Sequence, residues 1–229
     1  MSNSFGTLLR TTIFGQSHSK AIGVVIDGLP AGEILDFSAI SDFMRRRAPG
    51  RNAHSTSRRE TDEPEILSGL ADGRTCGAPL CAIIHNSDTH SSDYSDLKYR
   101  PRPAHSDFSA FVKFHGWNDI SGGGQFSGRL TAPLCFAGAV AKQLLHSHGI
   151  TVGAHILNIA GIHDDSLDTT STSPEELDNI AAKDFPVCND EAGEEMKKAI
   201  LSAKSEGDSV GGIIRCYVLG LPPGLGEPM

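Results

Sequence analysis

The sequence predicts an α+β fold, because two kinds of hydrophobic pattern occur along its 229 residues. Short apolar runs rich in β-branched residues are typical of strands, whereas apolar residues three or four positions apart are typical of helices. Turns that contain glycine and proline separate these segments. With 38% hydrophobic residues, the chain can bury the core of one large domain or of two small ones.

The N-terminal half contains the clearest strand pattern, at residues 21–27, which a Gly-Leu-Pro-Ala-Gly turn closes. Asp36 is a suitable N-cap for a helix whose apolar residues recur as far as Met44. The segment Ala48-Pro49-Gly50 then ends this helix. Two further strands are expected, at residues 65–69 and 79–85.

In the C-terminal half, Pro133 lies in the first turn of a helix that continues to about His148 and ends at Gly149. This helix is nearly apolar on every face up to Lys142, so we expect it in the core. The remaining elements are a strand at residues 151–162, a short helix capped by Ser173, a helix at residues 190–205 and a strand at residues 210–219.

The net charge of −8 is distributed unevenly. Residues 164–208 contain 13 acidic and 4 basic side chains, whereas residues 1–163 are nearly balanced, with 14 and 15. We interpret the acidic segment as a solvated helical region, which argues against nucleic acid as a partner. No apolar run reaches the length of a membrane span, and the first residues lack a signal-peptide pattern. We therefore expect no membrane partner and a cytoplasmic location.

The spacing of cysteines and histidines predicts neither disulfides nor a metal site. The five cysteines are odd in number, scattered and mostly set among apolar neighbours, which is typical of buried thiols. A metal-binding protein needs histidines and cysteines that converge, and no spacing here indicates such convergence. Seven histidines are interpreted as structural or exposed side chains: His54, His85, His90, His146, His148, His155 and His163.

Residues 100–133 are dense in functional side chains. Prolines fix the backbone around two arginines and His105 at the start, and Gly122-Gly123-Gly124 and Arg129 precede a helix N-terminus at the end. Glycines let backbone N–H groups approach a ligand, and helix N-termini attract anions, so the segment predicts an anion pocket. The alternative is a flexible glycine hinge with solvated arginines. Neither the dinucleotide-binding nor the P-loop fingerprint fits these glycines.

Six arginines fall within residues 45–59. Arginine is the usual choice for bidentate contacts with carboxylates and phosphates. Three of the six lie at the end of the predicted helix, where cations also relieve the helix dipole, but three in a row exceed what capping needs. His18 lies in a polar turn before the strand at residues 21–27, where a rigid scaffold can aim it. The alternative is a turn histidine exposed to water.

Taken together, three segments resemble chorismate synthases, and the resemblance extends along essentially the whole chain. The segments are Gly15-Gln16-Ser17-His18 with its following strand, Arg45 to Gly50 with Arg58-Arg59-Glu60, and Arg102 to Asp107 leading to the glycine run and Ser127-Gly128-Arg129. Residues 207–212 and 220–228 add later matches. Each piece alone is weak, but their co-occurrence in this order is highly specific.

The resemblance implies a β-α-β sandwich, with residues 1–229 in a single domain, that assembles as a homotetramer. It implies a lyase that removes phosphate and a proton from 5-enolpyruvylshikimate 3-phosphate to give chorismate. This reaction belongs to the shikimate pathway of aromatic amino acid biosynthesis. It also implies reduced FMN (FMNH2) as the cofactor, used without net redox change and reduced by an NADPH-dependent activity of the protein or by an external source.

The resemblance also implies roles for particular residues. A substrate with two carboxylates and a phosphate calls for convergent arginines, and the leaving phosphate calls for a proton donor. His18 would protonate the leaving phosphate, His105 would act on the reduced flavin, and both would face one cleft with the arginines. The implied ligand-binding residues are Ser17, Arg47, Arg102 and Arg129 for the substrate and Gln125, Phe126 and Ser127 for the flavin.

Four positions depart from the pattern of the family. Gln16 stands in place of a glutamate, Ser19 and Ala104 in place of glycines, and Ser121 in place of an arginine. Gln16 keeps the capacity for hydrogen bonding but lacks a charge that could hold His18 protonated. Ala104 fits its position only if its backbone φ is negative.

Chorismate synthases continue beyond the equivalent of Met229, so we expect a truncated member of the family that does not turn over by itself. The strand at residues 210–219 and its Gly-Leu-Pro-Pro-Gly turn repeat the pattern at residues 24–32 as a weak internal repeat, without the helix that follows there. We therefore expect an exposed apolar face on this strand, or one side of a cleft open to water. The alternative function is that of an inactive relative that only binds flavin or takes part in assembly.

Overall fold

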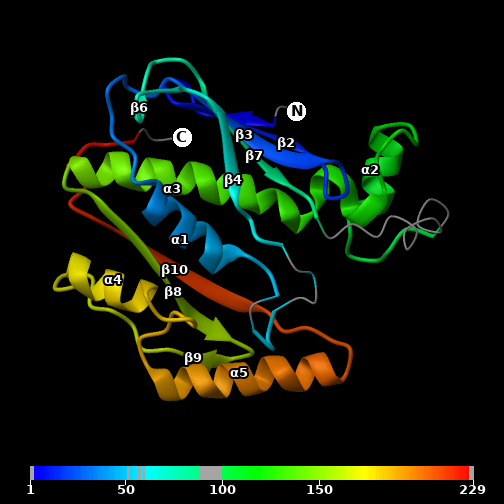
Figure 1. The fold of residues 1–229 in the computed structure, drawn as a ribbon. Helices are drawn as coiled ribbons and strands as arrows, with labels where there is room; N and C mark the ends of the chain where they lie inside the picture. The colour runs from blue at the N-terminus through cyan, green and yellow to red at the C-terminus, as the bar shows by residue number, and fades with distance from the viewer. Residues whose placement is uncertain (1–2, 51, 56–57, 59, 88–99, 227–229) are drawn as a thin grey trace. The chain divides into compact units, whose positions relative to one another are not determined.

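The computed structural model describes residues 3–50, 52–55, 58, 60–87 and 100–226. Helices and strands are mixed along the chain, which confirms the α+β class (Figure 1). Contacts divide the chain into two compact units, Met1–Arg51 with Ser57–Gln143 and Asn52–Thr56 with Leu144–Met229. The expectation of a single domain over residues 1–229 stays a prediction.

The first unit contains a five-stranded antiparallel sheet in the order β1-β2-β3-β7-β4. Its strands are β1 (Ser4–Phe5), β2 (Arg10–Gly15), β3 (Ala21–Asp27), β4 (Pro64–Ser68) and β7 (Leu80–His85). Alternate side chains of β3 face the core, since Ile22, Val24 and Ile26 are buried. Val24 pairs with Ala82 of β7, which is buried as well. The three strands expected here are confirmed to within one residue at each end.

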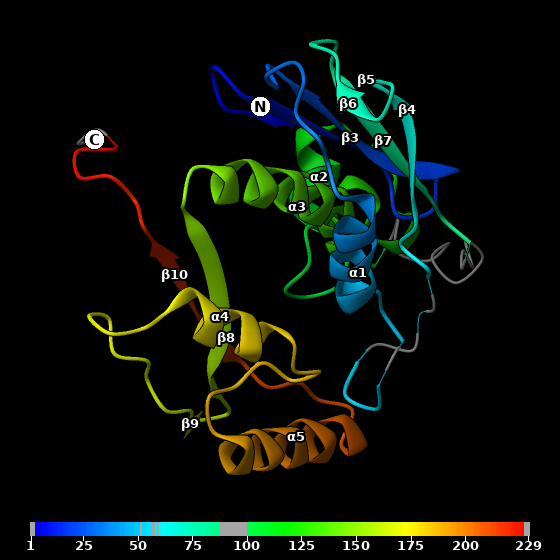
Figure 2. The same ribbon diagram turned by 60° about the vertical axis from the view of Figure 1, so that its left-hand side comes forward.

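Helix α1 (Phe37–Arg47) begins where the sequence predicts, because the side chain of Asp36 accepts a 3.0 Å hydrogen bond from the N–H of Ala39. The helix buries Ile40 and Met44. Figures 1 and 2 both show α1 and helix α3 (Thr131–Ser147) on the same side of the sheet. The two helices therefore cover the apolar face that β3 and β7 present.

Helix α3 is joined to the start of α1 by a reciprocal pair of hydrogen bonds. The N–H of Asp36 donates to Oε1 of Gln143 at 2.8 Å, and Nε2 of Gln143 donates back to the Asp36 carbonyl at 2.9 Å. Phe136 and Val140 are fully buried, which confirms the core position expected for this helix. The helix begins at Thr131, so Pro133 occupies its first turn.

Short elements complete the first unit. Strands β5 (Leu70–Ala71) and β6 (Arg74–Thr75) form a hairpin whose Asp-Gly turn has positive φ at both positions. Helix α2 (Asp107–Lys113) was not expected from the sequence, because its apolar residues are exposed and contribute little to the core. The 3-10 segments η2 (Ser121–Phe126) and η3 (Gly128–Leu130) lead directly into α3.

The second unit is built on a three-stranded antiparallel sheet in the order β10-β8-β9. Its strands are β8 (Thr151–Ile159), β9 (Ile162–His163) and β10 (Gly212–Leu219), and its helices are α4 (Pro174–Ala181) and α5 (Asp190–Ser205). The single strand expected at residues 151–162 is wrong, because Ala160 and Gly161 adopt positive φ and turn the chain into β9. Both predicted helices are confirmed, with Ser173 capping α4.

Two apolar clusters stabilise this unit. Leu177 and Ile180 of α4 pack with Tyr217, and Met196 of α5 packs with Ile156. Strand β10 lies at the edge of the sheet and leaves other apolar side chains exposed, which confirms the exposed face that the sequence predicts. These exposed side chains are Ile213, Ile214 and Val218.

The cysteines are all free thiols, but the expectation that they are buried is wrong. Cys76 and Cys216 are exposed, and the other three are partly buried. Among the helices of the described residues, none combines the length and the apolar character that a membrane crossing requires.

Candidate functional site

A network of arginines and carboxylates surrounds Asp62 in the first unit. Asp62 is buried, and its carboxylate accepts a 2.7 Å hydrogen bond from Nη1 of Arg47 and another from Nη1 of Arg129. Arg47 is the last residue of α1 and Arg129 lies in η3. The backbone of Asp62 has a φ of 55°, a conformation that aspartate tolerates better than most residues. One carboxylate therefore holds two arginines from different elements.

Further polar contacts orient both arginines. Nη2 of Arg47 donates to the Gly128 carbonyl at 3.1 Å and to Oγ1 of Thr131 at 3.0 Å. Nε of Arg129 donates to Oδ1 of Asn86 at 3.0 Å. The side chain of Arg129 is 2% exposed, whereas that of Arg47 is 20% exposed. Arg47 is thus the more accessible of the two to a ligand from solvent.

A third arginine lies beside Ser17. Nη1 of Arg58 donates to Oγ of Ser17 at 2.9 Å, and Nη2 of Arg58 is 2.7 Å from Oε1 of Glu60. Burial would raise the pKa of Glu60, but hydrogen bonds from the hydroxyl and N–H of Ser87, with Arg58 and Arg129, lower it to about 2. Glu60 is therefore ionised at neutral pH and partly balances the arginines.

The glycine run lies directly against Ser17 and His18. Gly122, Gly123 and Gly124 all have positive φ, between 55° and 86°. A Cβ atom at Gly122 would collide with the imidazole of His18 and would lie 2.8 Å from Oγ of Ser17. The N–H of Ser17 donates to the Gly124 carbonyl at 3.1 Å. Positive φ along the run, with close approach at Gly122 and Gly124, explains these glycines, which favours the predicted pocket over a flexible hinge.

Arg102 and His105 lie just before α2. Nε and Nη2 of Arg102 donate to the two carboxylate oxygens of Asp107 at 2.9 and 3.0 Å, which makes a bidentate pair. This hydrogen bonding from Arg102 is the largest cause of the lowered pKa of Asp107, although burial opposes it. His105 is exposed, and its electrostatic interaction with Asp107 also lowers the pKa of that carboxyl.

The central network combines an excess of positive charge with hydrogen-bond donors. Three arginines, Arg47, Arg58 and Arg129, surround the two carboxylates of Glu60 and Asp62. The formal sum of these five groups is +1, and the N-terminus of α3 follows η3 directly. Such an arrangement attracts an anion such as a phosphate or a carboxylate.

Comparison with known proteins gives the family. The family model described as chorismate synthase matches residues 9–229. The chain belongs to the chorismate synthase family. It is 42% identical to the chorismate synthase of Dehalococcoides mccartyi, with 100% of this chain and 62% of the relative covered. For the relative from Thermococcus kodakarensis the identity is 43%, with 97% of this chain and 60% of the relative covered.

A solved structure supports the same assignment. The crystal structure titled as that of chorismate synthase superposes with a TM-score of 0.73 at 28% identity, covering 96% of this chain and 60% of the other. The chain thus spans about three fifths of the length of these chorismate synthases.

Of the substrate residues implied by the resemblance to chorismate synthase, the structure connects three in one network. Ser17, Arg47 and Arg129 are linked through Arg58, Glu60 and Asp62, and His18 lies beside them at the glycine run. Arg102 and His105 belong to a different segment, paired with Asp107. Their convergence on the same cleft stays a prediction.

The three residues implied for the flavin follow the glycine run. Gln125 is exposed and its Oε1 accepts from Nδ2 of Asn3 at 3.4 Å. The ring of Phe126 is 46% exposed and lies 6.2 Å from the ring of Phe114. Oγ of Ser127 accepts from the N–H of Arg129 at 3.3 Å. This segment therefore offers an amide and an exposed aromatic face beside the arginine network.

The departures from the family pattern have visible consequences. Ala104 has a φ of 60°, although alanine favours a negative φ. The backbone there is therefore strained. Ser19 closes the turn that contains His18, since its Oγ lies 2.9 Å from the Gln16 carbonyl and 2.8 Å from the Ala21 carbonyl. Nδ2 of Asn86 donates to the same Gln16 carbonyl at 3.0 Å, which further fixes the turn.

Sequence reasoning missed the residues that organise this network, Asp62 and Asn86. Neither belongs to a motif that the sequence singled out. The signal that could have indicated Asp62 is the excess of arginine over residues 45–59, because buried arginines need carboxylate partners.

Proposed function

We propose that the chain binds 5-enolpyruvylshikimate 3-phosphate and takes part in its conversion to chorismate by elimination of phosphate and a proton. The observation that carries the proposal is the convergence of Arg47, Arg129 and Arg58 beside Ser17 and His18. Guanidinium groups suit the phosphate and carboxylates of this substrate. Family membership supports the assignment of the reaction.

In this proposal each group of the network has one task. Arg47 and Arg129 bind and orient the anionic groups, and Asp62 keeps the two guanidinium planes in place. His18 donates a proton to the leaving phosphate from its position against Gly122. Arg102 would add a further anion contact and His105 would move a proton near the flavin.

Reduced FMN fits the segment after the glycines. The exposed ring of Phe126 provides a surface for a planar ring system, and the Gln125 amide provides a hydrogen-bonding group beside it. Gln125, Phe126 and Ser127 would hold the cofactor. When bound, reduced FMN would supply an electron-rich ring for a reaction without net redox change.

The remaining features come from the family resemblance. We propose a homotetramer, a cytoplasmic location and NADPH as the source of reducing equivalents for the flavin. Light scattering coupled to size-exclusion chromatography tests the tetramer, since a monodisperse monomer would contradict it.

The decisive experiment mixes the purified chain with substrate and photoreduced FMN without oxygen, and measures substrate binding by calorimetry and phosphate release by a colorimetric assay. Arg47→Lys should weaken binding by about tenfold or more, because the lysine keeps the charge but loses the forked geometry. Arg10→Lys, an exposed position on β2, is the matched control. Unchanged binding by Arg47→Lys would refute the assigned role.

The same experiment distinguishes the proposed function from the alternative function. An inactive relative that only binds flavin would bind FMN without binding the substrate and without releasing phosphate. Substrate binding that depends on Arg47 would exclude that alternative, because only the anion site uses this side chain.

A further inference from the structure

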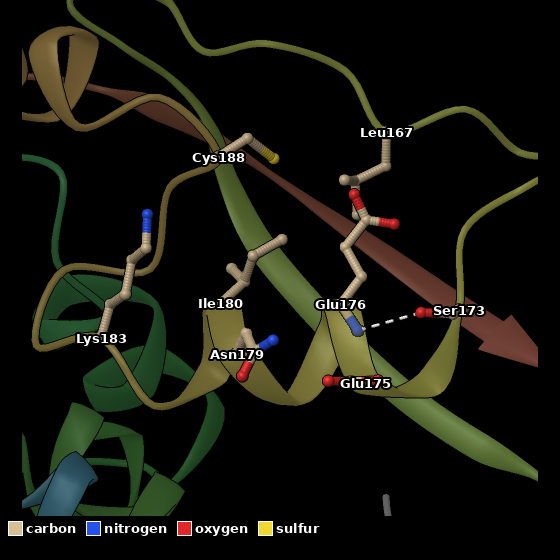
Figure 3. A pocket seen from close by; sticks show the side chains of 8 residues that line it. All are labelled: Leu167, Ser173, Glu175, Glu176, Asn179, Ile180, Lys183 and Cys188. Atoms are coloured by element: carbon tan, nitrogen blue, oxygen red, sulfur yellow. Dashed lines mark hydrogen bonds between the residues drawn. The ribbon is translucent and has the colours of Figure 1, made fainter.

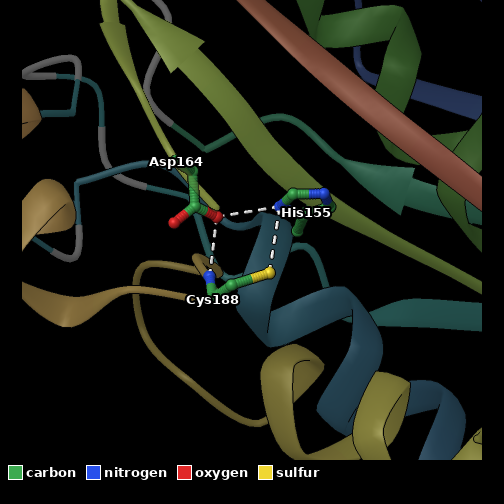
Figure 4. A group of neighbouring side chains, drawn as sticks. All are labelled: His155, Asp164 and Cys188. Atoms are coloured by element: carbon green, nitrogen blue, oxygen red, sulfur yellow. Dashed lines mark hydrogen bonds and ion pairs between the residues drawn. The ribbon is translucent and has the colours of Figure 1, made fainter. Parts of the chain in front are cut away.

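Three side chains with metal-binding atoms meet in the core of the second unit (Figure 4). They are His155 on β8, Asp164 just after β9 and Cys188 just before α5. Nδ1 of His155 lies 2.9 Å from Oδ2 of Asp164 and 3.5 Å from Sγ of Cys188. The side chains of His155 and Asp164 are at most 1% exposed. The expectation from spacing that no histidine and cysteine converge is therefore wrong.

Backbone contacts fix the carboxylate as an anion. Oδ2 of Asp164 accepts from the N–H of Cys188 at 2.7 Å, and Oδ1 accepts from the N–H of Asn189 at 2.8 Å. Burial would raise the pKa of Asp164, but these two N–H groups and His155 lower it. The fold thus places a negative charge in an apolar core beside a histidine and a thiol.

The arrangement is unsuited to nucleophilic catalysis by the cysteine. Asp164 and Cys188 both approach Nδ1 of His155, whereas a catalytic triad places the nucleophile and the carboxylate on opposite ring nitrogens. Burial and the carboxylate of Asp164 raise the pKa of Cys188 to about 12. The three ligand atoms lie within 4.8 Å of one another, which is an arrangement that can surround a metal ion.

We propose that His155, Asp164 and Cys188 bind a zinc ion. Tetrahedral zinc with ordinary Zn–N and Zn–S lengths separates the nitrogen and sulfur by about 3.5 Å. The separation of Nδ1 and Sγ is 3.5 Å. The same geometry separates nitrogen and carboxylate oxygen by about 3.3 Å, so Asp164 moves by only a few tenths of an ångström. Softness of the thiolate and imidazole favours zinc over magnesium or calcium.

Charge and protons balance in this proposal. Binding releases the proton of the Cys188 thiol to solvent, and the proton on Nδ1 of His155 moves to Nε2, which has no hydrogen-bond partner among the described residues. The thiolate and the carboxylate then carry two negative charges against the two positive charges of zinc. The filled site is formally neutral, as a buried site requires.

A cavity of about 360 Å³ lies on the Cys188 side of the cluster (Figure 3). Cys188 forms part of its wall, and the carboxylates of Glu175 and Glu176 lie on its lining. Glu176 also acts electrostatically on the Cys188 thiol. Lys183 is a basic side chain of the lining, and its Nζ pairs with Oδ1 of Asp190 at 2.7 Å. The acidic lining attracts a cation, and the cavity has room for a water as the fourth ligand.

Cobalt substitution tests the proposal on the intact chain. After removal of metal with a chelator, CoCl2 and then ZnCl2 are titrated, with calorimetry and absorption spectra as readouts. We expect one equivalent to bind and a thiolate-to-cobalt charge-transfer band to appear. Cys188→Ser should remove the band and weaken binding by at least about tenfold, since even partners outside the coordination sphere cost that much. Cys216→Ser, an exposed thiol of the same unit, is the matched control.

A second measurement requires no variant and so does not depend on whether Cys188→Ser folds. X-ray absorption of the zinc-loaded chain should show one sulfur ligand together with nitrogen and oxygen ligands. A spectrum without sulfur, a cobalt band that survives Cys188→Ser, or the absence of stoichiometric binding would each overturn the proposal.

Discussion

Replacement of Asp62 by alanine is expected to destabilise the first unit strongly. The Asp62 side chain is fully buried and pairs with both Arg47 and Arg129. Alanine removes the carboxylate that both arginines share, and the Arg129 guanidinium, only 2% exposed, keeps the more distant carboxylate of Glu60 at 3.8 Å. Breaking a buried ion pair by removal of one partner costs about 3–5 kcal/mol, because a charge is left uncompensated.

The melting temperature converts this free energy into a measurable shift. For chains of this size, each kcal/mol lowers the melting temperature by about 2–4 °C, so Asp62→Ala should melt roughly 6–20 °C below the parent. Asp62→Asn keeps an oxygen that accepts one hydrogen bond, so its melting temperature should lie between those of Asp62→Ala and the parent. Circular dichroism at neutral pH gives all three melting curves.

Glu63→Ala is the matched control, because this neighbouring carboxylate is exposed and its loss should change the melting temperature little. If Asp62→Ala melts within about 2 °C of the parent, the reasoning is refuted. Arg47 and Arg129 would then not depend on Asp62 for their charge balance in the folded chain.

Three further predictions concern the same unit. Gly122→Ala should lower the free energy of unfolding by more than about 1–2 kcal/mol in urea titrations. The reason is that the alanine Cβ collides with His18 and that its backbone must adopt a left-handed conformation. An unchanged urea midpoint would contradict the close approach. Ala104→Gly should raise stability by about 1 kcal/mol, because its φ of 60° suits glycine; a lower denaturation midpoint would contradict this. The pKa of Glu60 is depressed from 4.5 to about 2, so its stabilisation is present above pH 4.5 and is lost as pH falls towards 2. Acid titrations of Glu60→Gln should lack this part of the pH dependence.

Some of the candidate site could be predicted from the sequence, because the evidence was local. Glycines followed by an arginine indicated an anion pocket, and the crowding of arginines on α1 exceeded what capping requires. The structure connects Arg47 and Arg129 through the carboxylate of Asp62. The choice of Asp62 as their shared partner could not be predicted, since a residue without a motif gains its role only from its neighbours in space.

The elements show the same division. Strand β3 and helix α5 have the bounds that their sequence patterns predict, because alternation, capping and helical spacing act over a few residues. The division of residues 151–162 into β8 and β9 was missed, since Ala160 takes a positive φ that its side chain disfavours and that the surrounding sheet imposes.

The sequence by itself therefore determined the α+β class, most helices and strands, and the residue types of an anion site, all of which depend on short-range patterns. Only the tertiary structure decided which distant groups meet. It brought Asp62 to Arg129, and it brought His155 and Asp164 to Cys188. The physical reason is that burial makes a charged or polar side chain depend on partners that chain folding supplies, and spacing along the chain carries no record of them.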